Sequence, residues 1–187
     1  MKRPAVKAVL GLLATALVVP GLWATTAVER TETDMIEEAT LIVTGHCTHV
    51  ESAWLDGDLV TLATIGVSEV LKGTAGAEIT LVLPGGIDAN RPVPVATLYP
   101  AAPEVFVQED VLLFLVGEDR VANGHAIVGF SQGKFTLVSS ASQQVATQNL
   151  GGLRLARPDG QITRGASKAI SIPQLRQRIK DLAAKPR

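Results

Sequence analysis

In the segment His46-Cys47-Thr48-His49, the cysteine and the two histidines carry side chains that could bind a metal ion. Thiolate and imidazole groups are ligands for zinc and copper. Side chains alternate between the two faces of a strand, so His46 and Cys47 point to opposite faces, and Cys47 and His49 share a face only if no bulge intervenes. A small metal carrier using Cys47 and His49 is therefore one hypothesis. The competing interpretation is that Cys47 fills a core position in phase with Val43, with the histidines on the surface beside a turn.

A second candidate is the segment 129–133, GFSQG, which matches the G-x-S-x-G nucleophile turn of α/β-hydrolases. That turn needs a strand before the serine and a helix after it, and the histidine follows later in the chain. Here residues 134–138 alternate like a strand, and all three histidines precede Ser131. We interpret the segment as a hairpin turn and keep a serine hydrolase using Ser131 and His125 as an alternative.

The other polar and glycine-rich segments predict no further site. Residues 84–86, PGG, are too short for a phosphate loop and lack the following Gly-Lys-Ser/Thr. Residues 56–58, DGD, lack the alternating acids of a calcium loop. The sequence therefore predicts no catalytic residues, no cofactor and no established metal site.

Among the elements that must position these residues, the segment from Asp58 to Gly73 has the clearest pattern. Apolar residues recur at Leu59, Ala63, Ile65 and Val67, which is the period of a strand with one buried face. The alternation breaks at Glu69 and is expected to resume on Val70, as at a β-bulge. A similar break near Val50 in the preceding strand predicts a strongly bent hairpin, joined by a turn at Asp56-Gly57.

The same patterns predict the remaining elements, with Val111 to Val116 as the most buried strand. A short helix over 33–39 is expected to be capped by Thr33 or Asp34, and an amphipathic helix is expected over 171–185. Residues 139–148 are rich in Ser, Ala and Gln and are expected to form a loop. The predicted strands are 41–52, 58–73, 78–84, 93–98, 111–116, 125–130, 134–138 and 153–156. Short strands, hairpin turns and paired bulges favour a small β-barrel.

The N-terminus resembles a secretory signal peptide. Lys2, Arg3 and Lys7 precede an apolar run over 8–22, with small residues for cleavage after Ala27 or after Ala24. An uncleaved membrane anchor is the alternative, but the run is shorter than the roughly 20 residues that span a bilayer. We therefore expect a secreted or periplasmic protein with no membrane span after cleavage.

The net charge limits the classes of partner, and the cysteine count limits how the fold can be stabilised. The formal net charge of the whole chain is −1, and removing residues 1–27 takes away three basic residues and no acidic ones. An acidic mature chain argues against nucleic acid and anionic membranes as partners. With a single cysteine the chain has no internal disulfide, so packing must stabilise it.

The order of these segments resembles the netrin-like/TIMP-like group, whose domains are OB-type five-stranded barrels with helices. The resemblance rests on the strand 39–45, ATLIVTG, the VLKG ending at 70–73, the segment 79–86, ITLVLPGG, and the strand 111–115, VLLFL. Uncharacterised bacterial secreted proteins share this pattern and a QGKF segment, here 132–135. TIMP-type inhibitors begin with a zinc-chelating cysteine, whereas Cys47 lies inside a strand. The resemblance thus implies the barrel but not metalloprotease inhibition.

We therefore expect a non-enzymatic exported binding module, whose partner is an unknown exported protein or peptidase. The expected organisation is a signal peptide over 1–27, a flexible lead-in over 28–33, a barrel over 34–138, a loop-rich extension over 139–170 and a C-terminal helix over 171–187. The OB/netrin-like barrel, closed or partly open, would carry a short N-terminal helix and a C-terminal amphipathic helix.

Overall fold

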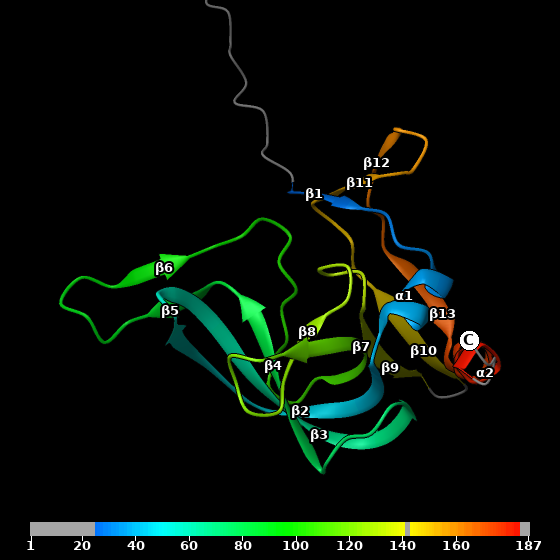
Figure 1. The fold of residues 1–187 in the computed structure, drawn as a ribbon, viewed down its shortest axis with the longest axis horizontal. Coiled ribbons are helices and arrows are strands. Elements are labelled where there is room, and N and C mark those ends of the chain that lie inside the picture. The colour runs from blue at the N-terminus through cyan, green and yellow to red at the C-terminus, as the bar shows by residue number, and fades with distance from the viewer. Residues whose placement is uncertain (1–24, 141–142, 184–187) are drawn as a thin grey trace, which may run out of the picture.

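A computed structural model describes residues 25–140 and 143–183 of the chain (Figure 1). The fold is mainly β with two helices, α1 (Glu32–Glu38) and α2 (Ile172–Ala183). Neither described helix is long and apolar enough to cross a membrane. The strands are β1 (Thr25–Val28), β2 (Leu41–Leu55), β3 (Asp58–Lys72), β4 (Glu78–Pro84), β5 (Gly86–Asp88), β6 (Val95–Thr97), β7 (Asp110–Glu118), β8 (Gly124–Ile127), β9 (Lys134–Ser140), β10 (Gln143–Gln148), β11 (Leu153–Ala156), β12 (Ile162–Arg164) and β13 (Lys168–Ser171).

Five strands of the large sheet close into a ring, which confirms the predicted small β-barrel. They pair in the order β7-β2-β3-β4-β8, and β8 pairs again with β7. The β4–β8 pairing is parallel and the other pairings in the ring are antiparallel. Figure 1 shows β2 and β3 curving around one side of this ring. The sheet then continues from β7 through β9 and β10 to β13.

The β2–β3 hairpin bends as the sequence predicted, although the positions of its irregularities differ. The turn lies at Asp56 and Gly57, which both have positive φ angles, 51° and 91°. The β2–β3 register shifts at three places, between residues 42 and 43, 44 and 45, and 47 and 49. The expected resumption of the buried face on Val70 is wrong: Val70 is 40% exposed, whereas Leu71 packs against a second core. Because two shifts lie at this end, the strand turns its other face inward there.

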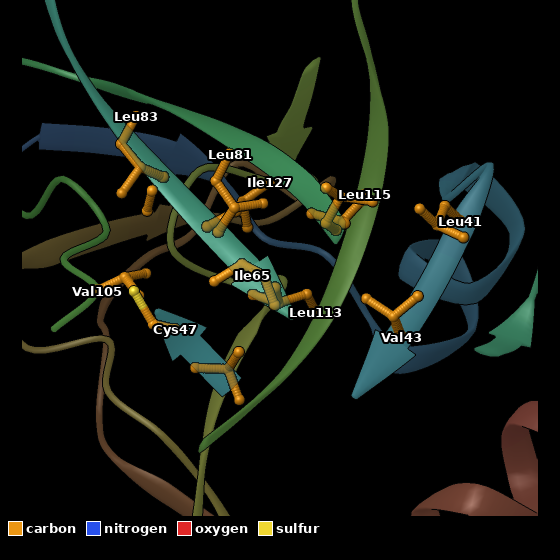
Figure 2. Packing of buried hydrophobic residues seen from close by; sticks show 13 residues of the cluster. Leu41, Val43, Cys47, Ile65, Leu81, Leu83, Val105, Leu113, Leu115 and Ile127 are labelled. Carbon is orange, nitrogen blue, oxygen red and sulfur yellow. The ribbon is translucent and has the colours of Figure 1, made fainter. Parts of the chain in front are cut away.

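The barrel interior is filled by aliphatic side chains from every strand of the ring. Ile65 and Leu81 are fully buried, and Ile79 and Leu83 of β4 join them in the same core. Figure 2 shows the sulfur of Cys47 pointing into this core near Val105. The core comprises Leu41, Val43, Cys47, Ala63, Ile65, Ile79, Leu81, Leu83, Val105, Val111, Leu113, Leu115 and Ile127.

A second core lies on the other face of β7, against both helices. Leu112 and Phe114 alternate with the barrel-facing residues of β7, so this strand is buried on both faces as predicted. Ile172, Leu175 and Ile179 place the apolar side of α2 in the same core. The C-terminal helix thus packs on the domain. Its predicted extent reaches Lys185, which lies outside the described residues.

Helix α1 begins earlier than its pattern suggested. The cap is Thr31 rather than Thr33 or Asp34: the Thr31 hydroxyl accepts from the Asp34 amide, and the Asp34 carboxylate accepts from the Thr31 amide. This reciprocal pair is a capping box, because it satisfies two backbone donors at the start of the helix. It also holds the pKa of Asp34 below its usual value.

Two segments expected to be irregular have regular structure instead. Residues 139–148 were expected to be a loop, but β9 extends to Ser140 and β10 begins at Gln143, with antiparallel pairing between them. The lead-in 28–33 was expected to be flexible, but Val28 ends β1 and Thr31 caps α1. Strand β1 pairs in parallel with β11, and β12 completes a small three-stranded sheet. Most of the expected signal peptide, residues 1–24, lies outside the described residues.

Candidate functional site

Cys47, the first candidate metal ligand, is a core residue. Its side chain is fully buried, and its thiol donates to the His49 carbonyl oxygen at 3.6 Å. Burial raises the pKa of the Cys47 thiol, because the charged thiolate would lose its solvation. A neutral, enclosed thiol is a poor ligand and a poor nucleophile.

The histidines beside Cys47 do not join it. The register shift between residues 47 and 49 lets His49 point outward, where its ring lies 3.7 Å from the Glu51 carboxylate. The His46 ring instead contacts residues at and just before the start of β7. Its Nδ1 lies 2.8 Å from a carboxylate oxygen of Asp110, and its Nε2 lies 3.2 Å from the side-chain oxygen of Gln108. Among the described residues, no group of three His, Cys, Asp or Glu side chains could hold a metal ion. The geometry therefore does not assemble the Cys47–His49 carrier site.

Ser131 and His125, the candidate hydrolase pair, lie in different places. The Ser131 hydroxyl is largely buried and donates to the Ala101 carbonyl oxygen at 2.5 Å. His125 lines a separate cavity, and its Nδ1 lies 2.9 Å from the Asn123 carbonyl oxygen. The segment 129–133 is a tight turn followed by strand β9, as its alternation indicated. The Ser131 hydroxyl therefore bonds to a backbone carbonyl oxygen, whereas the nucleophilic serine of a hydrolase would bond to a histidine.

The adjacent Gln132 fastens the N-terminal segment to the body of the protein. Its side chain is almost completely buried. The side-chain oxygen accepts from the Arg30 amide at 2.8 Å, and the side-chain nitrogen donates to the Val28 carbonyl oxygen at 2.9 Å. Gln148 donates to the Gln132 carbonyl oxygen at 2.5 Å. These bonds explain structurally why a glutamine follows the serine in this turn.

A polar centre that sequence reasoning missed lies beside Ser131. The Lys134 ammonium is 2.7 Å from the Glu109 carboxylate, and both side chains are mostly shielded, with 14% and 11% exposure. Thr136 donates to the same carboxylate at 2.5 Å, and the Phe106 amide donates to its other oxygen at 3.0 Å. Lys134 also donates to the Glu104 carbonyl oxygen. The available signal was the alternation of β9, which puts Lys134 and Thr136 on one face.

This centre anchors the segment 98–109, here called the strap, which connects β6 to β7. The strap is further tied by backbone bonds to Cys47 at Gln108 and Glu109, and Val105 enters the barrel core. Two of its residues, Ala101 and Gln108, have positive φ angles of 60° and 73°. Such conformations are costly outside glycine and persist where the surroundings hold them. The strap is therefore a firmly positioned segment.

The outward side of the strap is apolar. Leu98 is 80% exposed, Phe106 63%, and Tyr99 and Val107 about half. Two cavities adjoin the strap. A polar one of about 340 Å³ includes Ser131, Lys134 and Asn149, and a more apolar one of about 290 Å³ includes Val50, Leu83 and Ile87. Large apolar side chains that an ordered backbone exposes to solvent are typical of recognition surfaces.

Comparison with known proteins adds no family: no protein-family model matches the chain, and no curated protein matches it. The candidate site is therefore the strap with its anchors and the two adjoining cavities.

Proposed function

We propose that the protein is a non-enzymatic binding module that recognises an apolar segment of another polypeptide at the strap. The observation that carries this proposal is the contrast within the strap: its backbone is fixed by Ser131, Lys134 and Glu109, while Leu98 and Phe106 face solvent. A preordered apolar anchor loses little conformational freedom on binding, so more of its contact energy appears as affinity.

The chemistry of the neighbouring cavities supports a polypeptide as the partner. Interfaces combine aromatic and aliphatic anchors with a polar rim that accepts backbone hydrogen bonds. Tyr99 and Phe106 line both strap cavities, and Thr147 and Asn149 add neutral polar groups on one side. An extended segment with alternating apolar residues would fit both parts of this surface.

We further propose that the chain acts outside the cytoplasm, as a secreted or periplasmic protein, with an exported protein or peptidase as its partner. The basic residues Lys2, Arg3 and Lys7 followed by the apolar run 8–22 support export. We also propose that the barrel is of the OB type and related to the netrin-like group. The five-strand ring with one parallel β4–β8 pairing supports this assignment.

The strap proposal is tested by comparing partner capture by variants. The protein, carrying a photoreactive crosslinker, would be exposed to an envelope fraction. Leu98→Ser/Phe106→Ser should lose the crosslinked product of the wild type, with at least about tenfold weaker binding, because hot-spot side chains each contribute 1 kcal/mol or more. Val138→Ser is the matched control, since Val138 is 50% exposed on β9 and lines neither strap cavity.

Equal capture by the strap variant and the wild type would overturn the proposal, as would loss of capture in the Val138→Ser control alone. All three proteins should unfold at the same denaturant midpoint within error, because exposed side chains contribute little to the core.

A further inference from the structure

The small sheet β1-β11-β12 has two different faces. Its inner face packs Leu153 and Leu155, together with Ala27, onto a third apolar cluster that includes Leu150. Figure 1 shows this sheet at the edge of the molecule, with the β11–β12 hairpin projecting from it. The pairing register defines the outer face as two rows, Thr26–Arg154–Arg164 and Val28–Ala156–Ile162.

Two exposed arginines stand directly opposite each other on this outer face. Arg154 and Arg164 are cross-strand partners in the β11–β12 register. Like charges at directly opposed positions destabilise a sheet. Among the described residues, neither guanidinium takes part in an ion pair, whereas the nearby Arg157 is bonded to Glu29 at 2.6 Å. The remaining acid of this hairpin, Asp159, accepts from the Gln161 amide. The arginine pair thus has an uncompensated positive charge.

Apolar side chains lie beside these arginines. Val28 is 58% exposed and Ile162 51%, and their row is adjacent to the arginine row on the same face. An apolar pair next to basic groups suits the boundary between lipid headgroups and acyl chains, where apolar residues insert and guanidinium groups meet phosphates.

The position of the small sheet in the chain indicates what binds its outer face. Only residues 23 and 24 separate the apolar run 8–22 from Thr25, the first residue of β1. Before the expected cleavage, insertion of that run into a bilayer would hold the small sheet at the membrane surface. We propose that the outer face of β1-β11-β12 binds an anionic phospholipid surface, through Arg154 and Arg164 with Val28 and Ile162. The net charge of −1 conceals this local basic face. The inference is independent of partner binding at the strap.

The test is flotation of the full chain with vesicles of phosphatidylcholine, with and without phosphatidylglycerol. The apolar run 8–22 is expected to partition into both kinds of vesicle, so the ratio of the two affinities isolates the headgroup contribution. Arg154→Gln/Arg164→Gln should lower this ratio by about 30-fold, since each basic residue near an anionic leaflet contributes about a fivefold effect. Arg120→Gln/Arg178→Gln, with the same charge change elsewhere, should leave the ratio unchanged. Ile162→Ser should weaken binding to anionic vesicles at every salt concentration.

The proposal is overturned if the wild type binds both vesicles equally, or if the two double variants behave alike. A control with inorganic phosphate distinguishes a soluble anion from a lipid headgroup as the ligand. If phosphate alone protects β11 and β12 from hydrogen exchange in an arginine-dependent way and vesicles do not, the ligand is a soluble anion and the lipid assignment is wrong. Arg154→Gln/Arg164→Gln should remain at least as stable as the wild type, because it removes a like-charge pair.

Discussion

At the scale of single residues, the Glu109–Lys134 pair connects the barrel to the strap. Both charges are largely removed from water, and each has further hydrogen-bond partners: Thr136 and the Phe106 amide for the carboxylate, and the Glu104 carbonyl for the ammonium. Removing one partner of such a pair leaves the other charge poorly solvated, whereas removing both does not.

Lys134→Met should therefore destabilise the protein by roughly 1–3 kcal/mol, a value below that of fully buried pairs because some solvent reaches both groups. The measurement is urea unfolding followed by circular dichroism. Glu109→Gln/Lys134→Met should lose less than the sum of the two single variants, since no unpaired charge remains. Additive losses would show that the two charges do not interact energetically.

The residue scale also shows what sequence patterns can and cannot predict about the site. The alternation of β2 correctly offered Cys47 as a core residue, because burial follows from period. It could not pair Glu109 with Lys134, which come from segments 25 positions apart and meet only because β7 and β9 are neighbours. His125 and Ser131 are much closer in sequence, yet they line different cavities.

At the scale of elements, β3 contributes Ala63 and Ile65 to the barrel core from the middle of its length. Ile65→Asp should unfold the domain, because an unpaired carboxylate at this fully buried position costs several kcal/mol. Ser68→Asp, at an exposed position on the same strand, should stay folded. Thermal melting of both proteins checks this expectation. A cooperative Ile65→Asp transition near that of the wild type would show that the barrel tolerates a charge at its centre.

The sequence predicts strands correctly where apolar residues alternate along the chain. It misses strands that form only because neighbouring strands pair with them. Strand β10 is polar in sequence, and it forms because β9 and β13 pair with its two edges. Strand β1 is too short to be recognised by period, and it is held by β11 and by the Gln132 side chain. These contacts are tertiary, so no local pattern reports them.

At the scale of the whole molecule, β7 joins two cores that would otherwise be separate. Its odd-numbered residues, such as Leu113, face the barrel, while Leu112 and Phe114 face the helices. The barrel and the C-terminal elements therefore share one strand, and we expect them to unfold together. The small sheet with β1 lies outside both cores and has its own cluster.

The two candidate cleavage sites of the expected signal peptide affect this small sheet differently. Cleavage after Ala24 leaves β1 entire, whereas cleavage after Ala27 removes three of its four residues. A chain that starts at Thr25 should be more stable than one that starts at Val28 by about 1–2 kcal/mol, from lost backbone pairing and the packing of Ala27. Urea unfolding of the two chains measures the difference. Ala27→Asp in the longer chain is the control of equal length, and it should lose a similar amount by disrupting the same packing. Equal stability of all three chains would mean that β1 contributes nothing to the fold, and the mature N-terminus would then be free of this structural constraint.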